Sequence, residues 1–191
     1  MDSVTGVFIT HTHGDHVNGI PAFAHSLHWP FKTADPVFLI PEQNIVDLLK
    51  QWLSAIKHGP ARELCWIVYK EGVIYNDGYL KVTAIPTKHL DVSSAFLLEA
   101  EEKRVLVTGD LEREHPTDFP QIAYDVPLDM IFCEGAHFPV TEYKPIFEKC
   151  DVKQVCIQHW APWNRVNFSG LINHFESLPI TVAGDGEEFD L

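Results

Sequence analysis

The feature that most limits what this chain can fold into is a cluster of metal-binding residue types near its N-terminus. Segment 11–16 reads His-Thr-His-Gly-Asp-His and directly follows the apolar run 4–10. Imidazole nitrogens and carboxylate oxygens are the ligands that a zinc-type ion prefers. A strand that ends in a turn can aim the first two histidines at one point, and Gly14 lets the backbone turn so that Asp15 and His16 face a second point. The pattern favours two neighbouring metal ions, as in hydrolytic two-metal sites, over a histidine-rich surface loop.

Length and charge narrow the class of protein. A chain of 191 residues predicts one domain over 1–191 with a substantial core. The net charge of −13 disfavours nucleic acid or an anionic membrane as a partner. A small phosphorylated substrate remains compatible with this charge, because bound dications would invert the local field.

The cysteines predict a reducing environment. No CxxC pair occurs among Cys65, Cys133, Cys150 and Cys156, and all but Cys150 lie in apolar runs. We expect buried thiols, with a disulfide or a metal role as the alternative. The sequence contains no signal peptide or membrane-spanning stretch, so a cytoplasmic location is expected.

Apolar strand-like runs alternate with helical patterns along the chain, which predicts an α/β fold with sheets layered between helices. The expected strands are 4–10, 37–40, 64–70, 73–75, 79–85, 94–99, 104–108, 128–133, 152–158 and 179–183. The expected helices are 17–27, 42–57, 141–149 and 168–177. The segment 76–78, Asn-Asp-Gly, is a hairpin turn signal between two of the strands.

Three further residues of ligand type share one placement. His89, Asp110 and His159 each come just past an apolar run, where strand ends hold side chains firmly. Taken alone, each has an ordinary explanation as a surface histidine or a turn aspartate. Together with segment 11–16 they predict a complete set of ligands.

This series of residues resembles the ligand series of the metallo-β-lactamase superfamily in order and approximate spacing over residues 4–191. The resemblance implies an αββα sandwich with two metal ions at one edge, between two sheets. The ligands it implies are His11, His13 and His89 for the first metal, Asp15, His16 and His159 for the second, and Asp110 as the bridge between them. A bridging water or hydroxide would be the nucleophile, with zinc favoured and manganese or iron as alternatives.

The sequence departs from the superfamily pattern at its N-terminus. Members usually carry several strands before the first motif, one of them with an aspartate that supports the ligand loop, whereas here the motif begins at residue 11. The sandwich is therefore expected to be N-terminally incomplete, and the loss of the supporting aspartate leaves full metal occupancy and activity as open questions. A truncated gene, or a partner chain such as a second copy that covers the open sheet edge, would account for the difference.

The stretch His-Gly-Asp-His-Val-Asn-Gly-Ile-Pro resembles the phosphodiesterase branch of that superfamily, which includes enzymes of the ribonuclease Z type. In that branch a glutamate supports the site, a position matched by Glu134, and His137 would serve as a general acid, with a surface-loop histidine as the alternative. Asp15 would bind metal and accept the proton of the nucleophile. No basic arm for gripping RNA is evident, so a small phosphodiester or related ester is expected. An iron-dependent oxidoreductase and a metal-binding domain without turnover are the alternatives.

Several aromatic and histidine residues have no assigned role. The segment His25–Phe31 and the tryptophans Trp160 and Trp163 are candidates for a pocket rim or lid, with packing as an equal alternative. Three other histidines are expected at the surface, namely His58, His115 and His174.

Overall fold

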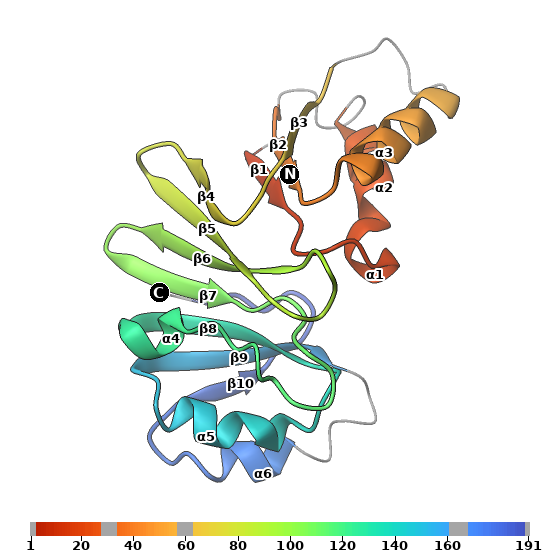
Figure 1. Cartoon of the computed structure of the whole chain (residues 1–191). Coiled ribbons are helices and arrows are strands. Elements are labelled where there is room, and N and C mark those ends of the chain that lie inside the picture. The colour runs from red at the N-terminus through yellow and green to blue at the C-terminus, as the bar shows by residue number, and fades with distance from the viewer. Residues whose placement is uncertain (1–2, 28–33, 57–62, 161–167, 190–191) are drawn as a thin grey trace. The chain divides into compact units, whose positions relative to one another are not determined.

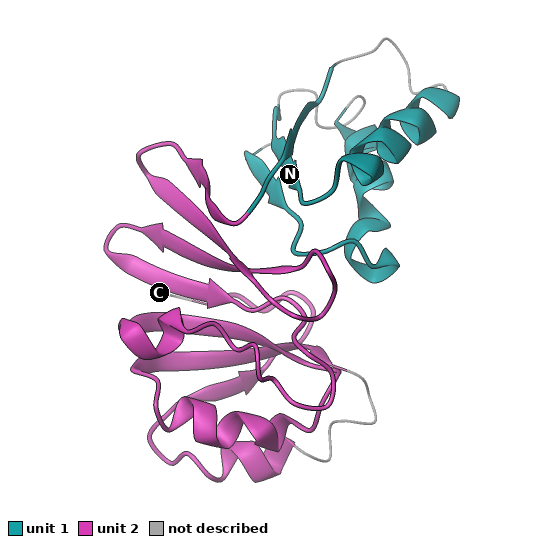
Figure 2. Cartoon of the chain, in the orientation of Figure 1, with its two compact units in different colours: residues 1–70 teal, residues 71–191 magenta. Residues whose placement is uncertain are grey.

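The computed structural model describes residues 3–27, 34–56, 63–160 and 168–189 (Figure 1). The chain divides into two compact units, unit 1 over Met1–Lys70 and unit 2 over Glu71–Leu191 (Figure 2). No described helix is both long enough and apolar enough to span a membrane. The single domain expected from chain length stays a prediction.

Unit 1 is built on a parallel sheet of three strands in the order β1-β2-β3. Its elements are β1 (Gly6–Phe8), α1 (Gly14–Val17), α2 (Gly19–Ser26), β2 (Val37–Ile40), α3 (Gln43–Ala55) and β3 (Cys65–Val68). The central strand is fully buried at Phe38 and Ile40, which pack with apolar side chains of α2 and α3. Because all three strands run in the same direction, their carboxyl ends lie at one edge of the sheet.

Unit 2 contains a mixed sheet of seven strands in the order β10-β9-β8-β7-β6-β5-β4. The strands are β4 (Gly72–Asn76), β5 (Leu80–Pro86), β6 (Ser94–Ala100), β7 (Lys103–Val107), β8 (Leu128–Gly135), β9 (Val152–Trp160) and β10 (Ile180–Val182). The helical segments are α4 (Ile122–Asp125), the 3-10 turn η1 (Val140–Tyr143), α5 (Lys144–Phe147) and α6 (Phe168–Ile172). Side chains of η1, α5 and α6 pack with the sheet to form the main core of this unit.

Strand direction determines which strand ends lie together at one edge of the sheet of unit 2. Strand β6 is antiparallel to both β5 and β7, whereas β7, β8 and β9 are mutually parallel neighbours. The four strands β5, β7, β8 and β9 therefore run in the same direction. Their carboxyl ends meet at one edge of the sheet, where open α/β sheets bind ligands.

Most of the expected elements are confirmed, and the differences have local causes. The strand predicted at 37–40 has those exact bounds, whereas the helix predicted at 141–149 is a 3-10 turn followed by a short α-helix. Pro145 lies in the first turn of α5, where the N–H that proline lacks would have no partner within the helix, so proline is tolerated there. The helix expected to reach 177 ends at Ile172.

The burial predicted for the cysteines holds for Cys133 and Cys156 but is wrong for Cys65, which is exposed. Cys65 begins β3, an edge strand with a neighbour on one side only, so an apolar run there need not be buried. Cys150 is half-buried.

Candidate metal centre

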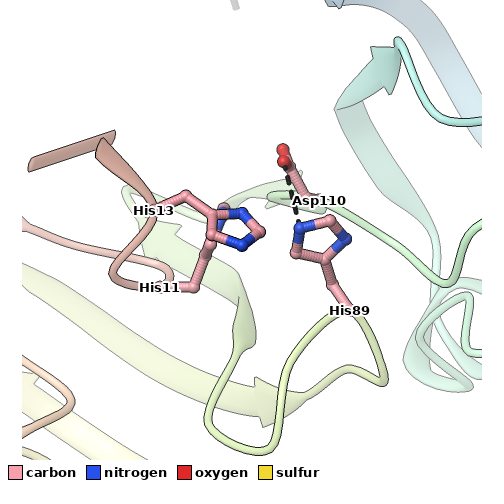
Figure 3. Close-up of side chains that lie close together, drawn as sticks. All are labelled: His11, His13, His89 and Asp110. Carbon is pink, nitrogen blue, oxygen red and sulfur yellow. Dashed lines mark hydrogen bonds and ion pairs between the residues drawn. The ribbon is translucent and has the colours of Figure 1, made fainter. Parts of the chain in front are cut away.

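The first candidate ligands lie in the loop that leaves β1. The N–H of Ile9 donates to the carbonyl of Leu39 at 3.0 Å, which extends the pairing with β2 by one residue. The buried ring of His11 then follows, with Nε2 at 3.2 Å from Nδ1 of His13 (Figure 3). Two nitrogens bound to one tetrahedral zinc lie about 3.3 Å apart, given Zn–N distances of about 2.0–2.1 Å. This pair of imidazoles therefore fits one metal ion.

The next two candidates lie on the short helix α1. Nε2 of His16 is 3.7 Å from the Asp15 carboxylate, and the ring centre of His16 is 4.0 Å from that of His11. The N–H of His16 donates to the carbonyl of His13 at 3.0 Å, which closes the turn after Gly14. A Cβ on that glycine would lie 3.1 Å from the Asn18 side chain, so the turn is tight. The whole first motif thus forms one compact group within unit 1.

Asp110 is the centre of the candidate residues in unit 2. It follows β7 after Gly109, whose φ of 60° lies in the left-handed region that glycine adopts freely. Its carboxylate is almost fully buried, with Oδ2 at 3.6 Å from Nε2 of His89 (Figure 3) and Oδ1 at 3.4 Å from Nδ1 of His159. The two oxygens of one carboxylate are thus directed at two different histidines.

His159 is positioned by an irregularity in the sheet. The register between β8 and β9 pairs Glu134 with Gln158 and then Gly135 with Trp160, so His159 is the extra residue of a β-bulge. Its φ of 46° is in the left-handed region, which is strained for a residue with a Cβ. A bulge of this kind redirects a side chain at the end of a strand, and here the imidazole is directed towards Asp110.

Glu134 holds the surroundings of Asp110 in place. Its Oε1 accepts the N–H of Leu111 at 2.6 Å, while Oε2 accepts the N–H groups of Ala136 and His137 and lies 2.6 Å from Nδ1 of the His137 ring. The carbonyl of Leu111 is in turn 3.0 Å from Nδ1 of His89. A donor at Nδ1 leaves Nε2 of His89 with the lone pair that metal binding needs.

The electrostatics of this group follow from its burial. Burial, the largest cause, and the negative charge of Asp110 raise the pKa of the Glu134 carboxyl to about 7, although the N–H donors of Leu111, His137 and Ala136 act to lower it. Ligand atoms of Asp110, Glu134, His137 and His159 all lie within 4.8 Å of one another. The donor set of imidazoles and carboxylates suits a zinc-type divalent cation.

The described structure thus brings together His11, His13, Asp15 and His16 within unit 1, and Asp110, His89, His137 and His159 within unit 2. The metal-binding and catalytic roles of these residues stay predictions. Sequence reasoning did not single out two residues that contact the unit 1 loop, Tyr69 and Glu42.

The structure places the histidines and tryptophans without an assigned role in different environments. His115 and His174 are exposed and pair with Glu142 and Glu148, in agreement with a surface location. Trp160 donates from Nε1 to the carbonyl of Ala183 and packs against Phe168, which favours the packing alternative. Outside the described residues lie His58, Trp163 and the segment 28–31.

Comparison with known proteins places these features in a family. A family model described as anti-Pycsar protein Apyc1 matches residues 1–138. Ribonuclease Z of Leuconostoc mesenteroides is 30% identical over 89 residues, which are 45% of this chain and 27% of that protein. Ribonuclease Z of an Exiguobacterium species is 31% identical over 115 residues, which are 58% of this chain and 36% of that protein. The matched stretches thus span only about a third of these relatives.

Solved structures agree on the fold. The metallo-β-lactamase fold protein YhfI from Bacillus subtilis aligns with a TM-score of 0.74 at 16% identity, over 97% of this chain and 78% of that one. The short form of human tRNase Z gives a TM-score of 0.71 at 14% identity, over 97% and 78%. Zn²⁺-bound PqqB from Methylobacterium extorquens gives 0.65 at 14% identity, over 98% and 71%. The chain therefore has the metallo-β-lactamase fold and belongs to the family of the anti-Pycsar protein Apyc1.

Proposed function

We propose that this chain is a metal-dependent hydrolase that binds two divalent ions, zinc in the first instance, and acts on a small phosphodiester or a related ester. The observation that carries the proposal is the environment of Asp110, whose Oδ2 lies near His89 and whose Oδ1 lies near His159. A carboxylate that bridges two metal ions through both of its oxygens directs one oxygen to each set of ligands. The arrangement within unit 2 fits this mode of bridging.

The proposed ligands follow the order of the superfamily along the sequence. The first metal would be held by His11, His13 and His89, the second by Asp15, His16 and His159, and both by Asp110. The spacing of 3.2 Å between the facing nitrogens of His11 and His13 supports the first of these sets. When bound, the ions would supply the positive charge that polarises a substrate oxygen and activates water.

The proposed roles of the other residues follow from their hydrogen bonds. Glu134 fixes the segment after Asp110 through the N–H of Leu111. The Asp110 carboxylate would therefore need no rearrangement before it bridges the metal ions. The Glu134 carboxylate also lies 2.6 Å from Nδ1 of His137 and orients that ring. An imidazolium at this position can give its second proton to a leaving oxygen, which is the general-acid role. Asp15, exposed beside the loop, would accept the proton of the attacking water.

A small substrate fits the chain better than an RNA. The net charge of −13 opposes a broad contact with a polyanion, whereas a small phosphodiester needs only the charge supplied at the metal centre. The family name describes an anti-Pycsar protein, and we infer that this chain shares that role through its hydrolase activity. Cells with an active Pycsar system would then lose that activity when they express the wild-type chain but not the Asp110→Ala chain.

The first test is metal analysis of the purified chain by plasma mass spectrometry, followed by turnover of bis(p-nitrophenyl) phosphate. About two zinc or manganese ions per chain are expected, with turnover that a chelator abolishes and added metal restores. Iron as the only bound metal would favour the oxidoreductase alternative. Less than one ion per chain after reconstitution, without turnover, would contradict the proposal.

A further inference from the structure

Two residues of unit 1 that are not proposed ligands hold the loop that carries the first ligands. This ligand loop comprises residues 9–13 and follows β1. Glu42 lies two residues after the end of β2, and Tyr69 lies directly after the end of β3. Because the three strands are parallel neighbours, these three points of the chain meet at the same edge of the sheet.

Tyr69 fixes the direction in which the chain leaves β1. Its buried hydroxyl donates to the carbonyl of Ile9 at 2.6 Å and lies 3.3 Å from the carbonyl of Thr10. Its own N–H donates to the carbonyl of Ile40 at 3.1 Å, so the tyrosine is itself anchored to β2. The backbone immediately before His11 is therefore held by a side chain from the far strand of the sheet.

Glu42 fixes the residue between the two histidines. It occupies the N-cap position of α3, yet its side chain makes no cap hydrogen bond there. Its Oε2 instead accepts the hydroxyl of Thr12. His13 has extended backbone angles, φ −62° and ψ 151°, and in an extended segment successive side chains point to opposite sides. An anchored Thr12 thus keeps both neighbouring imidazoles on the other side of the loop.

We propose that Tyr69 and Glu42 are positioning residues that arrange His11 and His13 for metal binding before the metal arrives. The proposal rests on the metal site described under Proposed function. Together the two residues hold the backbone before the first histidine and the side chain after it, which leaves the facing nitrogens 3.2 Å apart. Removing residues that orient metal ligands typically weakens metal binding about 10-fold to 100-fold.

The test is the Zn²⁺ affinity of the full chain, measured by competition with a chromogenic chelator, together with the absorption spectrum of the Co²⁺-loaded chain. Tyr69→Phe removes only the hydroxyl, and Glu42→Ala removes the acceptor of Thr12. Each should weaken the tighter Zn²⁺ site about 10-fold to 100-fold and change the Co²⁺ bands. Glu42→Gln should stay near wild type, because its amide oxygen can still accept from Thr12.

Thr12→Val breaks the same hydrogen bond but leaves the N-terminus of α3 unchanged. A folding defect at that helix terminus could therefore not explain its effect. Thr12→Val should weaken Zn²⁺ binding as much as Glu42→Ala, and the double variant should lose no more than either alone. Tyr75→Phe and Gln43→Ala, which remove contacts to exposed aspartates, are the matched controls and should keep the wild-type affinity.

The outcomes separate the two proposals. Wild-type affinity and Co²⁺ spectra in both Tyr69→Phe and Glu42→Ala, with metal bound by the wild type, would overturn the positioning role and leave the proposed function standing. A loss of affinity fully matched by a loss of metal-free thermal stability would also overturn it, because the role would then be structural. A wild-type chain that binds no metal would overturn both.

Discussion

The two units hold residues of the same chemical types in different ways. Unit 1 carries four candidate ligands in six consecutive residues, held by a short helix and by side chains that follow β2 and β3. Unit 2 collects its candidates from the ends of β5, β7 and β9, which lie far apart in the sequence. A ligand loop is thus specified locally, whereas a ligand set on strand ends is specified by the order and direction of strands.

The two units also differ in what a single substitution should remove. In unit 2 the candidates share one central carboxylate, Asp110, with Glu134 behind it. In unit 1 the support is divided between Tyr69, which contacts Ile9, and Glu42, which contacts Thr12. Loss of the central residue of unit 2 should therefore be more damaging than loss of one ligand in unit 1.

Asp110→Ala should have the largest effect. The variant loses the proposed bridge, so two-metal occupancy should disappear and phosphodiester turnover should fall by roughly three orders of magnitude. Metal counting by plasma mass spectrometry and steady-state kinetics measure both effects. Asp125→Asn, at an exposed position in α4, is the control, and two-metal occupancy retained in Asp110→Ala would contradict the bridging role.

His13→Ala should have the next largest effect, confined to metal-dependent properties. Zn²⁺ affinity should fall by at least about 100-fold, and most of the thermal stabilisation by added metal should be lost. Calorimetry with and without zinc measures the loss, and the metal-free melting temperature should change little. His174→Ala, an exposed ring paired with Glu148, should behave as wild type in both.

Gly135→Ala should show how strongly the bulge in unit 2 depends on close packing. A Cβ there would lie 3.0 Å from Cγ2 of Ile157 and 3.1 Å from Cβ of Trp160. The expected loss is about 1–3 kcal/mol in the free energy of unfolding, measured by urea denaturation of the metal-free chain. Gly170→Ala meets only an ordinary contact at 3.5 Å to Thr141, so it should be neutral or slightly stabilising.

Asp129→Asn should have the smallest effect and should not change turnover. Asp129 lies at the start of β8, the opposite end from the candidate site, and a hydrogen bond from Lys153 is the main cause that holds its pKa below the usual range. A lowered pKa stabilises the fold above the unfolded-state pKa of about 3.9 and loses that effect as pH falls through the folded-state value.

At pH 7 the substitution should cost about 1 kcal/mol, because the lysine partners are solvent-screened. The difference from wild type in urea denaturation should shrink as the pH falls below about 4. A difference that grew on acidification would contradict the assignment.

The sequence predicted the fold best where apolar residues and turn residues follow one another closely. Strand 37–40 is a short apolar run between two prolines, and such a run has few alternatives to a buried strand. Helix α4 has four residues, too few to show a helical period, and it was not predicted. The exposure of Cys65 depends on β3 being an edge strand, which is a property of the sheet and not of the residues around the cysteine.

The candidate site was predictable to the extent that its residues have ligand chemistry. His89 and His159 could be named because imidazoles after apolar runs are informative, but the bulge that directs His159 depends on pairing with β8. Tyr69 and Glu42 carry no such signal. A tyrosine after a strand predicts core packing, and a glutamate before a helix predicts a favourable dipole interaction. Their contacts to the ligand loop span 60 and 30 residues of sequence.

The left-handed backbone of His159 also bears on how such a protein can be stabilised. At a φ of 46° a histidine is disfavoured by about 1–2 kcal/mol, whereas glycine adopts this conformation freely. On the metal-binding role that we propose for His159, an imidazole here lowers stability in return for function. Random variants selected only for heat resistance should accumulate glycine at position 159, and those clones should be more robust and inactive.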